Sequence, residues 1–342
     1  MPAADRVACR IADYHHQQVN GTIMKLSFPR FPFSPILGWS ISRHELFDKC
    51  KRQYYYTYYG KYIQDVPSYK VQQLRALTSI PLEIGNVVHD VLEAFLKRLQ
   101  KSDRDIDEER FIVFARDLVK RYFAEKSFIE QYYRYDEHFS MERVYGKVET
   151  CLRNFIGSPG YHWIFMAALH DRDNWIIEPA GFGETRLEGL KAYCKMDFLL
   201  PVDDCVYILD WKTGKRDEVK HSRQLIGYAA AANALFDIPW NRILPRIVYL
   251  YPEFDEMELT VGDEDRELFF RRIKEETGEM YAYCSDVEKN IPLPVDAFPP
   301  SPSPPLCRQC RYRELCFPRW REDDAAKRAG PDAVWSSVPE VH

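Results

Sequence analysis

One apolar segment ends in an acid and a base that share a face. Residues 205–212 read CVYILDWK, and the period of two along a strand puts Asp210 and Lys212 on the same side. If the two residues at 203–204 form a hairpin loop, Asp197 of the preceding strand lies opposite Asp210, with Cβ atoms about 5 Å apart. Facing carboxylates repel each other in a buried sheet unless a cation lies between them. The spacing therefore predicts a divalent metal ion at this strand end, with Lys212 beside it.

The cysteines predict a second metal site. The chain contains nine, and three of them follow a proline-rich segment in a Cys-x2-Cys-x5-Cys pattern, at Cys307, Cys310 and Cys316. This spacing presents three thiolates to one point, and thiolates favour zinc or an iron–sulfur cluster. Both kinds of site normally use four protein ligands, so a fourth ligand must come from elsewhere in the chain.

Two amphipathic helices precede the strands. The first is predicted over residues 40–62, with a capping box at Ser42 and Glu45 and with Cys50 on its apolar side. The second carries His89 beside four apolar residues that would face inward, namely Val88, Leu92, Phe95 and Leu96.

The remaining segments predict an α/β protein. Residues 103–170 are expected to be mostly helical, with a break at 158–160, after which the hydrophobic period changes to two. The pattern then predicts a β-meander over 176–212, a helix over 221–236, a strand over 246–252 and a helix over 263–289.

The composition is that of a globular protein. The 342 residues are 46% hydrophobic, which is enough for a sizeable core, and the net charge of -5 argues against a polyanion-binding tail. The sequence contains neither a signal-peptide pattern nor an apolar run of about 18 residues, so we expect a cytoplasmic protein without membrane contact. Residues 1–38 are predicted to be an extension and 322–342 a weakly ordered tail.

The chemistry-bearing residues occur in a recognisable order, which is His89, Asp197, Asp210-x-Lys212 and Gln224-x3-Tyr228. On a helix, three strands, a helix and a strand, this order resembles the PD-(D/E)XK nuclease superfamily in its RecB-like branch. The cysteine pattern is similar to that of the AddB nuclease domain and of the RecB-like exonucleases of CRISPR adaptation.

The resemblance implies a metal-dependent active site. His89, Asp197 and Asp210, with the backbone carbonyl of Trp211, would ligate Mg²⁺ or Mn²⁺, and Lys212 would orient or activate the attacking water. Hard cations prefer carboxylates, and the imidazole suits Mn²⁺. A phosphodiester is anionic, so the metal and the lysine would both stabilise the attacking hydroxide and the developing negative charge.

Further residues have implied roles around this site. Gln224 and Tyr228 would support the active site and the DNA, and Glu184 on the first strand is an additional candidate metal ligand. The sequence departs from many relatives at two positions near Asp197, where Cys194 replaces a glycine and Phe198 an arginine.

The resemblance also supplies the fourth cysteine. It implies a [4Fe–4S] cluster held by Cys50, Cys307, Cys310 and Cys316, with zinc as the alternative metal. The implied fold is a restriction-endonuclease-like core over 39–321, in which helices flank a mixed central sheet. It would carry a helical insertion at about 100–172 and an iron–sulfur staple that joins its N- and C-terminal parts.

The implied activity is that of a DNA nuclease, most simply an exonuclease on single-stranded DNA or DNA ends in repair, recombination or antiviral defence. The chain carries no helicase motif, so a helicase or an integrase-like protein is an expected partner. The alternative is a non-catalytic nucleic-acid-binding or structural subunit. The basic residues that follow the catalytic strand are predicted to contact phosphates, and they are Lys215, Arg216, Lys220 and Arg223.

Overall fold

The computed structural model describes residues 26, 28–102, 104, 106–134, 139–166, 172–179, 183–202 and 204–317. The predicted tail at 322–342 and most of the predicted extension at 1–38 lie outside these residues. Among the described helices, none combines the length and the apolar character that a membrane crossing requires.

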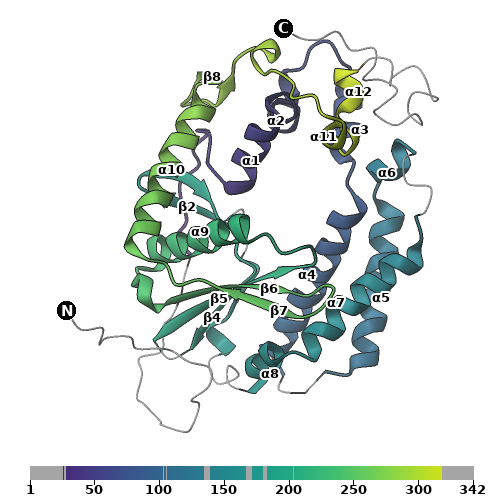
Figure 1. Ribbon diagram of the computed structural model, residues 1–342, viewed down its shortest axis with the longest axis vertical. Helices are drawn as coiled ribbons and strands as arrows, with labels where there is room; N and C mark the ends of the chain where they lie inside the picture. The colour runs from purple at the N-terminus through teal and green to yellow at the C-terminus, as the bar shows by residue number, and fades with distance from the viewer. Residues whose placement is uncertain are drawn as a thin grey trace.

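A five-stranded mixed sheet forms the centre of the fold (Figure 1). Its strands lie in the order β1 (Ile176–Ile177), β4 (Phe198–Val202), β5 (Cys205–Lys212), β6 (Ile243–Tyr249) and β7 (Asp255–Glu258). Strands β5 and β6 are parallel, because helix α9 (Glu218–Phe236) connects them, and the other neighbours are antiparallel. This arrangement confirms the predicted α/β class and mixed sheet.

The hairpin of β4 and β5 has the predicted register. Val202 pairs with Cys205 across a two-residue loop, and Phe198 pairs with Leu209. Continuing this register by one residue places Asp197 opposite Asp210. The strand ends therefore bring the two carboxylates together, as their spacing predicted.

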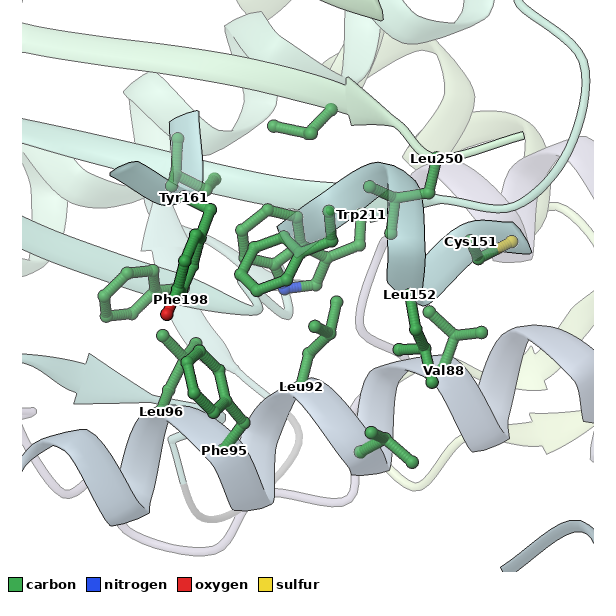
Figure 2. Close-up of a cluster of buried hydrophobic side chains, with 14 of the residues drawn as sticks. Val88, Leu92, Phe95, Leu96, Cys151, Leu152, Tyr161, Phe198, Trp211 and Leu250 are labelled. Atoms are coloured by element: carbon green, nitrogen blue, oxygen red, sulfur yellow. The ribbon is translucent and has the colours of Figure 1, made fainter. Parts of the chain in front are cut away.

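Helices cover both faces of the sheet. Helix α4 (Ile80–Leu99) packs on one face, and its four predicted inward residues belong to one buried core with Trp211 and Phe198 (Figure 2). Helix α9 packs on the opposite face, where the buried run Ala229–Ala232 allows a close approach to the strands. Along β5, Trp211 therefore faces α4, whereas Asp210 faces α9.

The segment between α4 and the sheet is helical, as predicted. It contains α5 (Glu108–Glu125), α6 (Ile129–Tyr132), α7 (Met141–Ile156) and α8 (Pro159–Met166). Helices α5 and α7 share the α4 core through buried residues such as Leu118 and Leu152. The predicted break falls at Gly157 and Ser158, after which Pro159 occupies the first position of α8.

The predicted single helix over 40–62 is wrong. The chain forms α1 (Ile41–Lys49) and α2 (Lys51–Tyr58), separated by Cys50 in an extended conformation. The cap of α1 is Ser40, whose Oγ accepts the backbone N–H of Arg43, so the predicted Ser42 capping box is also wrong. The break arises because the thiol of Cys50 itself caps α2, accepting the backbone N–H of Gln53.

The predicted three-stranded meander is likewise corrected. Strands β2 (Glu184–Leu187) and β3 (Leu190–Tyr193) form a separate two-stranded sheet, with Glu188 and Gly189 in the left-handed turn between them. The free edge of β3 pairs with Trp39, which donates its N–H to Lys191 and accepts that of Tyr193. That edge is therefore occupied, and the chain bends before β4 begins.

The C-terminal part packs back against the first helices (Figure 1). Helix α10 (Asp263–Tyr281) ends eight residues earlier than predicted, because the next residues form the hairpin of β8 (Cys284–Asp286) and β9 (Ile291–Pro292). Short helices α11 (Pro304–Arg308) and α12 (Arg313–Cys316) follow, beside α2 and α3 (Ser68–Ala76). The tyrosine run of α2 is buried here, with Tyr55 against Phe298 at a ring separation of 4.8 Å, so these aromatic rings serve packing.

Candidate active site

The candidate site lies where α4 and α9 meet the ends of β4 and β5. Asp197 is buried at the start of β4, where its Oδ2 accepts the backbone N–H of Trp211 at 3.1 Å. The ring of His89 reaches the same place from α4, with Nδ1 3.2 Å from Asp197 Oδ2. The other ring nitrogen, Nε2, lies 2.9 Å from the carbonyl oxygen of Trp211. The residues predicted as metal ligands from α4 and β4 are therefore in direct contact.

The charges of His89 and Asp197 stabilise each other. Burial alone would lower the pKa of His89, but the charge of Asp197, the hydrogen bond to it and the charge of Asp210 raise the pKa to about 9. Burial would raise the pKa of Asp197, but the positive charges of His89 and Lys212 hold it below its usual range. Without a bound metal, His89 would therefore be an imidazolium that donates to two acceptors.

Asp210 is held from α9 and from its own strand. Its Oδ1 accepts the hydroxyl of Tyr228 at 2.5 Å and the amide of Gln224 at 3.4 Å. Its Oδ2 forms an ion pair with Lys212. Burial and the negative charge of Asp197 nevertheless raise the pKa of Asp210. A divalent cation between the two carboxylates would remove this repulsion.

Glu178 is a site residue that the sequence analysis missed. It follows β1, and its N–H donates to the carbonyl oxygen of Asp197 at 2.8 Å. One candidate ligand atom from each of His89, Glu178 and Asp197 lies within 4.8 Å of the others. Its signal in the sequence was an acid directly after the two isoleucines of β1, the same apolar-to-acid pattern that marks Asp210.

The predicted additional ligand, Glu184, lies elsewhere. Its carboxylate is 2.8 Å from Arg186 and 3.7 Å from Lys191, within the separate β2–β3 sheet. The metal position is instead surrounded by the imidazole of His89 and the carboxylates of Glu178 and Asp197, with Asp210 opposite. This set of donors suits a hard divalent cation such as Mg²⁺ or Mn²⁺. The donor set of this edge therefore fits the metal that the resemblance implied.

Three of the four basic residues predicted to contact phosphates have acidic partners. Arg216 pairs with Asp255 at 2.6 Å, and Lys220 pairs with Glu45 at 2.8 Å. Arg223 pairs with Glu276, which also accepts the indole N–H of Trp39. These ion pairs join α9 and the loop before it to neighbouring elements, which leaves the three cations poorly suited to attract DNA.

The four predicted cluster cysteines line one small pocket, and they are Cys50, Cys307, Cys310 and Cys316. The backbone N–H groups of Gln53 and Ser301 donate to the sulfur of Cys50 at 3.4 and 3.5 Å. Burial raises the pKa of Cys316 to about 12, and the nearby sulfurs of Cys50 and Cys307 contribute to the rise. Thiols in this pocket would ionise together only around a positively charged centre, so the residues fit a thiolate-bound metal group.

The remaining described cysteines lie apart from this pocket. Cys194 is buried against α9, where its thiol donates to the carbonyl oxygen of Gly227 at 3.4 Å. Cys151 of α7 lies in the core that α7 shares with α4 (Figure 2). Cys205 begins β5. The departure at Cys194 is therefore a packing feature of the α9 interface.

Comparison with known proteins places these observations in a family. The family model described as the PD-(D/E)XK nuclease superfamily matches residues 38–317. No curated protein matches the sequence. A solved structure titled "Crystal structure of SSO0001" is similar to this chain at 17% identity, over 52% of this chain and 74% of the other, with a TM-score of 0.27.

Proposed function

Because the chain belongs to the PD-(D/E)XK nuclease superfamily, we propose that it is a metal-dependent DNA nuclease whose active site is the edge formed by Asp197 and Asp210. The observation that carries the proposal is the meeting of His89, Glu178 and Asp197 within 4.8 Å. Asp210 and Lys212 lie at the adjoining strand end. A structural or purely binding subunit would have no need for this high-energy group of buried charges.

The protein side of the chemistry is divided among these residues. His89, Glu178, Asp197 and Asp210 would hold Mg²⁺ or Mn²⁺, with the Trp211 carbonyl adjacent to them. When bound, the metal lowers the pKa of water and neutralises charge on the phosphate.

Lys212 supplies a positive charge next to Asp210 that the attacking hydroxide and the developing phosphorane charge both require. Tyr228 and Gln224 hold the Asp210 carboxylate from the opposite side, which keeps it oriented toward the metal position. Burial of Tyr228 raises its pKa well above the ordinary value, so it stays a hydrogen-bond donor at any physiological pH.

We propose an exonuclease that acts on single-stranded DNA or DNA ends, in the RecB-like branch of the superfamily. The cysteine pocket supports this assignment, because Cys50 and the Cys307–Cys316 segment would hold a [4Fe–4S] cluster that joins the two ends of the domain. A role in repair, recombination or antiviral defence, with a helicase or integrase-like partner, follows from the same branch.

The activity is tested with labelled single- and double-stranded DNA, with and without Mn²⁺. Wild-type protein should cleave only with the metal, and Asp210→Asn and Lys212→Ala should each reduce cleavage by at least about 100-fold, since both groups act on the reacting phosphate. Lys274→Ala, on the exposed surface of α10, is the matched control. Cleavage retained in both active-site variants would exclude this site.

A further inference from the structure

A large groove lies between the start of α4 and helices α6 and α7. It has a volume of about 1100 Å³, and its walls come from the start of α4, from α6 and α7, and from the loop after α11. In Figure 1 these elements lie above and to the right of the sheet. The volume exceeds that of a pocket for a small ligand, which is roughly 300–1,000 Å³. A segment of a polymer is therefore a better match than a metabolite.

The charged lining of the groove is mainly positive. Arg143 and Lys147 lie one turn apart on α7, and Arg308 lines the opposite wall. Among the residues that the structure describes, neither Arg143 nor Lys147 has an acidic partner within ion-pair distance. The carboxylate in the groove, Glu130, is buried and accepts the N–H of Ile80 at 3.0 Å. The unpaired charges of Arg143 and Lys147 suit a polyanion.

An aromatic ring completes the lining. Tyr251 is 37% exposed, and the ammonium group of Lys147 lies 4.7 Å from its ring centre. The side-chain amide of Asn154 donates to the carbonyl oxygens of Leu250 and Pro252, so α7 fixes the backbone on both sides of this ring. An exposed, positioned ring beside cations is the arrangement on which unpaired bases stack.

The backbone beside the groove is hydrogen-bonded to the end of the catalytic strand β5. Leu250, next to Tyr251, donates its N–H to the carbonyl oxygen of Lys212 at 2.8 Å. On the other wall, α4 passes directly beside the end of β5, since a Cβ built on Gly85 would lie 3.5 Å from Thr213 Oγ1. Gly85 lies on α4 between the groove-lining start of the helix and His89. A strand with one phosphate at Lys212 would therefore have its next nucleotides beside Tyr251.

We infer that this groove binds the single-stranded continuation of the DNA whose phosphate occupies the active site. Arg143, Lys147 and Arg308 contact phosphates, and Tyr251 stacks on a base. The inference rests on the proposed nuclease function. It assigns the substrate path to α7 and the cysteine loop, instead of to the ion-paired cations of α9 and of the loop before it.

The groove also touches the cysteine pocket. Arg308 and Gln309 are the two residues between Cys307 and Cys310, so one loop contributes both to the groove wall and to the cysteine pocket. The staple would therefore hold part of the DNA path in place, although it lies apart from the catalytic carboxylates.

Binding of a labelled single strand of about 12 nucleotides to the full chain in EDTA tests the inference without any cleavage step. The Arg143→Gln/Lys147→Gln variant should bind more weakly, with a dependence of log K on log salt that is shallower by about 1.4, the value for two lost phosphate contacts on a single strand. Tyr251→Ala should weaken binding by about 5- to 150-fold. The control Arg271→Gln/Arg272→Gln, on the exposed face of α10, should leave affinity and slope unchanged.

Two results would overturn the inference. One is an unchanged affinity and salt slope in the Arg143/Lys147 variant. The other is a Tyr251→Ala variant whose affinity falls equally for single strands and for blunt duplex of the same length. A duplex has no unpaired base to stack on Tyr251, so its binding should not depend on that ring. Both measurements stand even if the wild-type protein proves not to cleave DNA, so failure of the groove and failure of the nuclease proposal are separable.

Discussion

Metal binding at the active site should depend steeply on pH because of His89. This ring is 2.9 Å from the Trp211 carbonyl oxygen and 3.2 Å from Asp197, and its pKa is raised to about 9. A histidine must be neutral to ligate a metal, so binding has to displace a proton. The affinity for Mn²⁺ should therefore increase as the pH rises toward 9.

The size of the effect follows from the pKa. With a value of about 9, only about 1% of the His89 rings are neutral at pH 7, which weakens the apparent affinity about 100-fold, or ~2.7 kcal/mol. Between about pH 6 and about pH 8 the apparent affinity should rise roughly tenfold per pH unit. Each bound ion should release about one proton at neutral pH.

Isothermal titration of EDTA-treated, dialysed protein with Mn²⁺ measures both quantities, since titrations in buffers of different ionisation enthalpy count the released protons. The control is His89→Asn, which keeps the three carboxylates but removes the titrating ring. It should bind Mn²⁺ more weakly, with a much flatter pH profile. A wild-type affinity that is constant over this range, or a slope equal to that of His89→Asn, would refute the reasoning.

Two further predictions concern stability. Cys50→Ser should remove the iron and the brown colour from anaerobically purified protein and make the chain protease-sensitive, because opening the loop from Cys50 to Cys307 removes a cross-link worth on the order of 5 kcal/mol. The control Cys284→Ser, outside the cysteine pocket, should keep about four irons per chain. Colourless wild-type protein with one zinc would contradict the cluster. Leu92→Ala should lower the free energy of unfolding by about 2–5 kcal/mol, because Leu92 is fully buried against the sheet. Leu82→Ala, on the exposed side of α4, should change the free energy of unfolding by no more than about 0.5 kcal/mol. Equal losses in urea titrations would contradict the packing in Figure 2.

The sequence was sufficient where local periodicity and a short turn determine the geometry. A two-residue loop leaves one register for β4 and β5, so the juxtaposition of Asp197 with Asp210 followed from counting residues. The inward face of α4 followed from its helical period in the same way, and with it the position of His89.

The sequence was insufficient where contacts distant in the chain decide the outcome. Glu178 reaches the site only because the two-residue strand β1 pairs with β4, and so short a strand carries almost no periodic signal. In the sequence Glu184 was also an acid on a predicted strand near the site. It lies elsewhere because its hairpin forms a separate sheet, in which Trp39 pairs with the edge of β3. The partners of Arg216 and Lys220, which are Asp255 and Glu45, likewise come from other elements.

The cysteine segment shows why this domain would need a cross-link. Helices α11 and α12 contain five and four residues, far below the roughly 12–15 at which an isolated helix becomes even marginal in water. Two buried polar contacts hold them from one side: the guanidinium of Arg313 lies 3.6 Å from the centre of the Tyr133 ring, and Glu314 pairs with Lys70 at 2.8 Å.

On another side of this segment, the sulfurs of Cys307, Cys310 and Cys316 line a pocket together with that of Cys50. A thiolate-bound cluster at that point would order the loop that carries Arg308 and so complete the groove. Loss of the cluster should then weaken single-strand binding in EDTA by about as much as Arg308→Gln does, while Arg308→Gln keeps its iron. If iron-free protein bound single strands as tightly as the wild type, the cysteine loop would have no part in the DNA path.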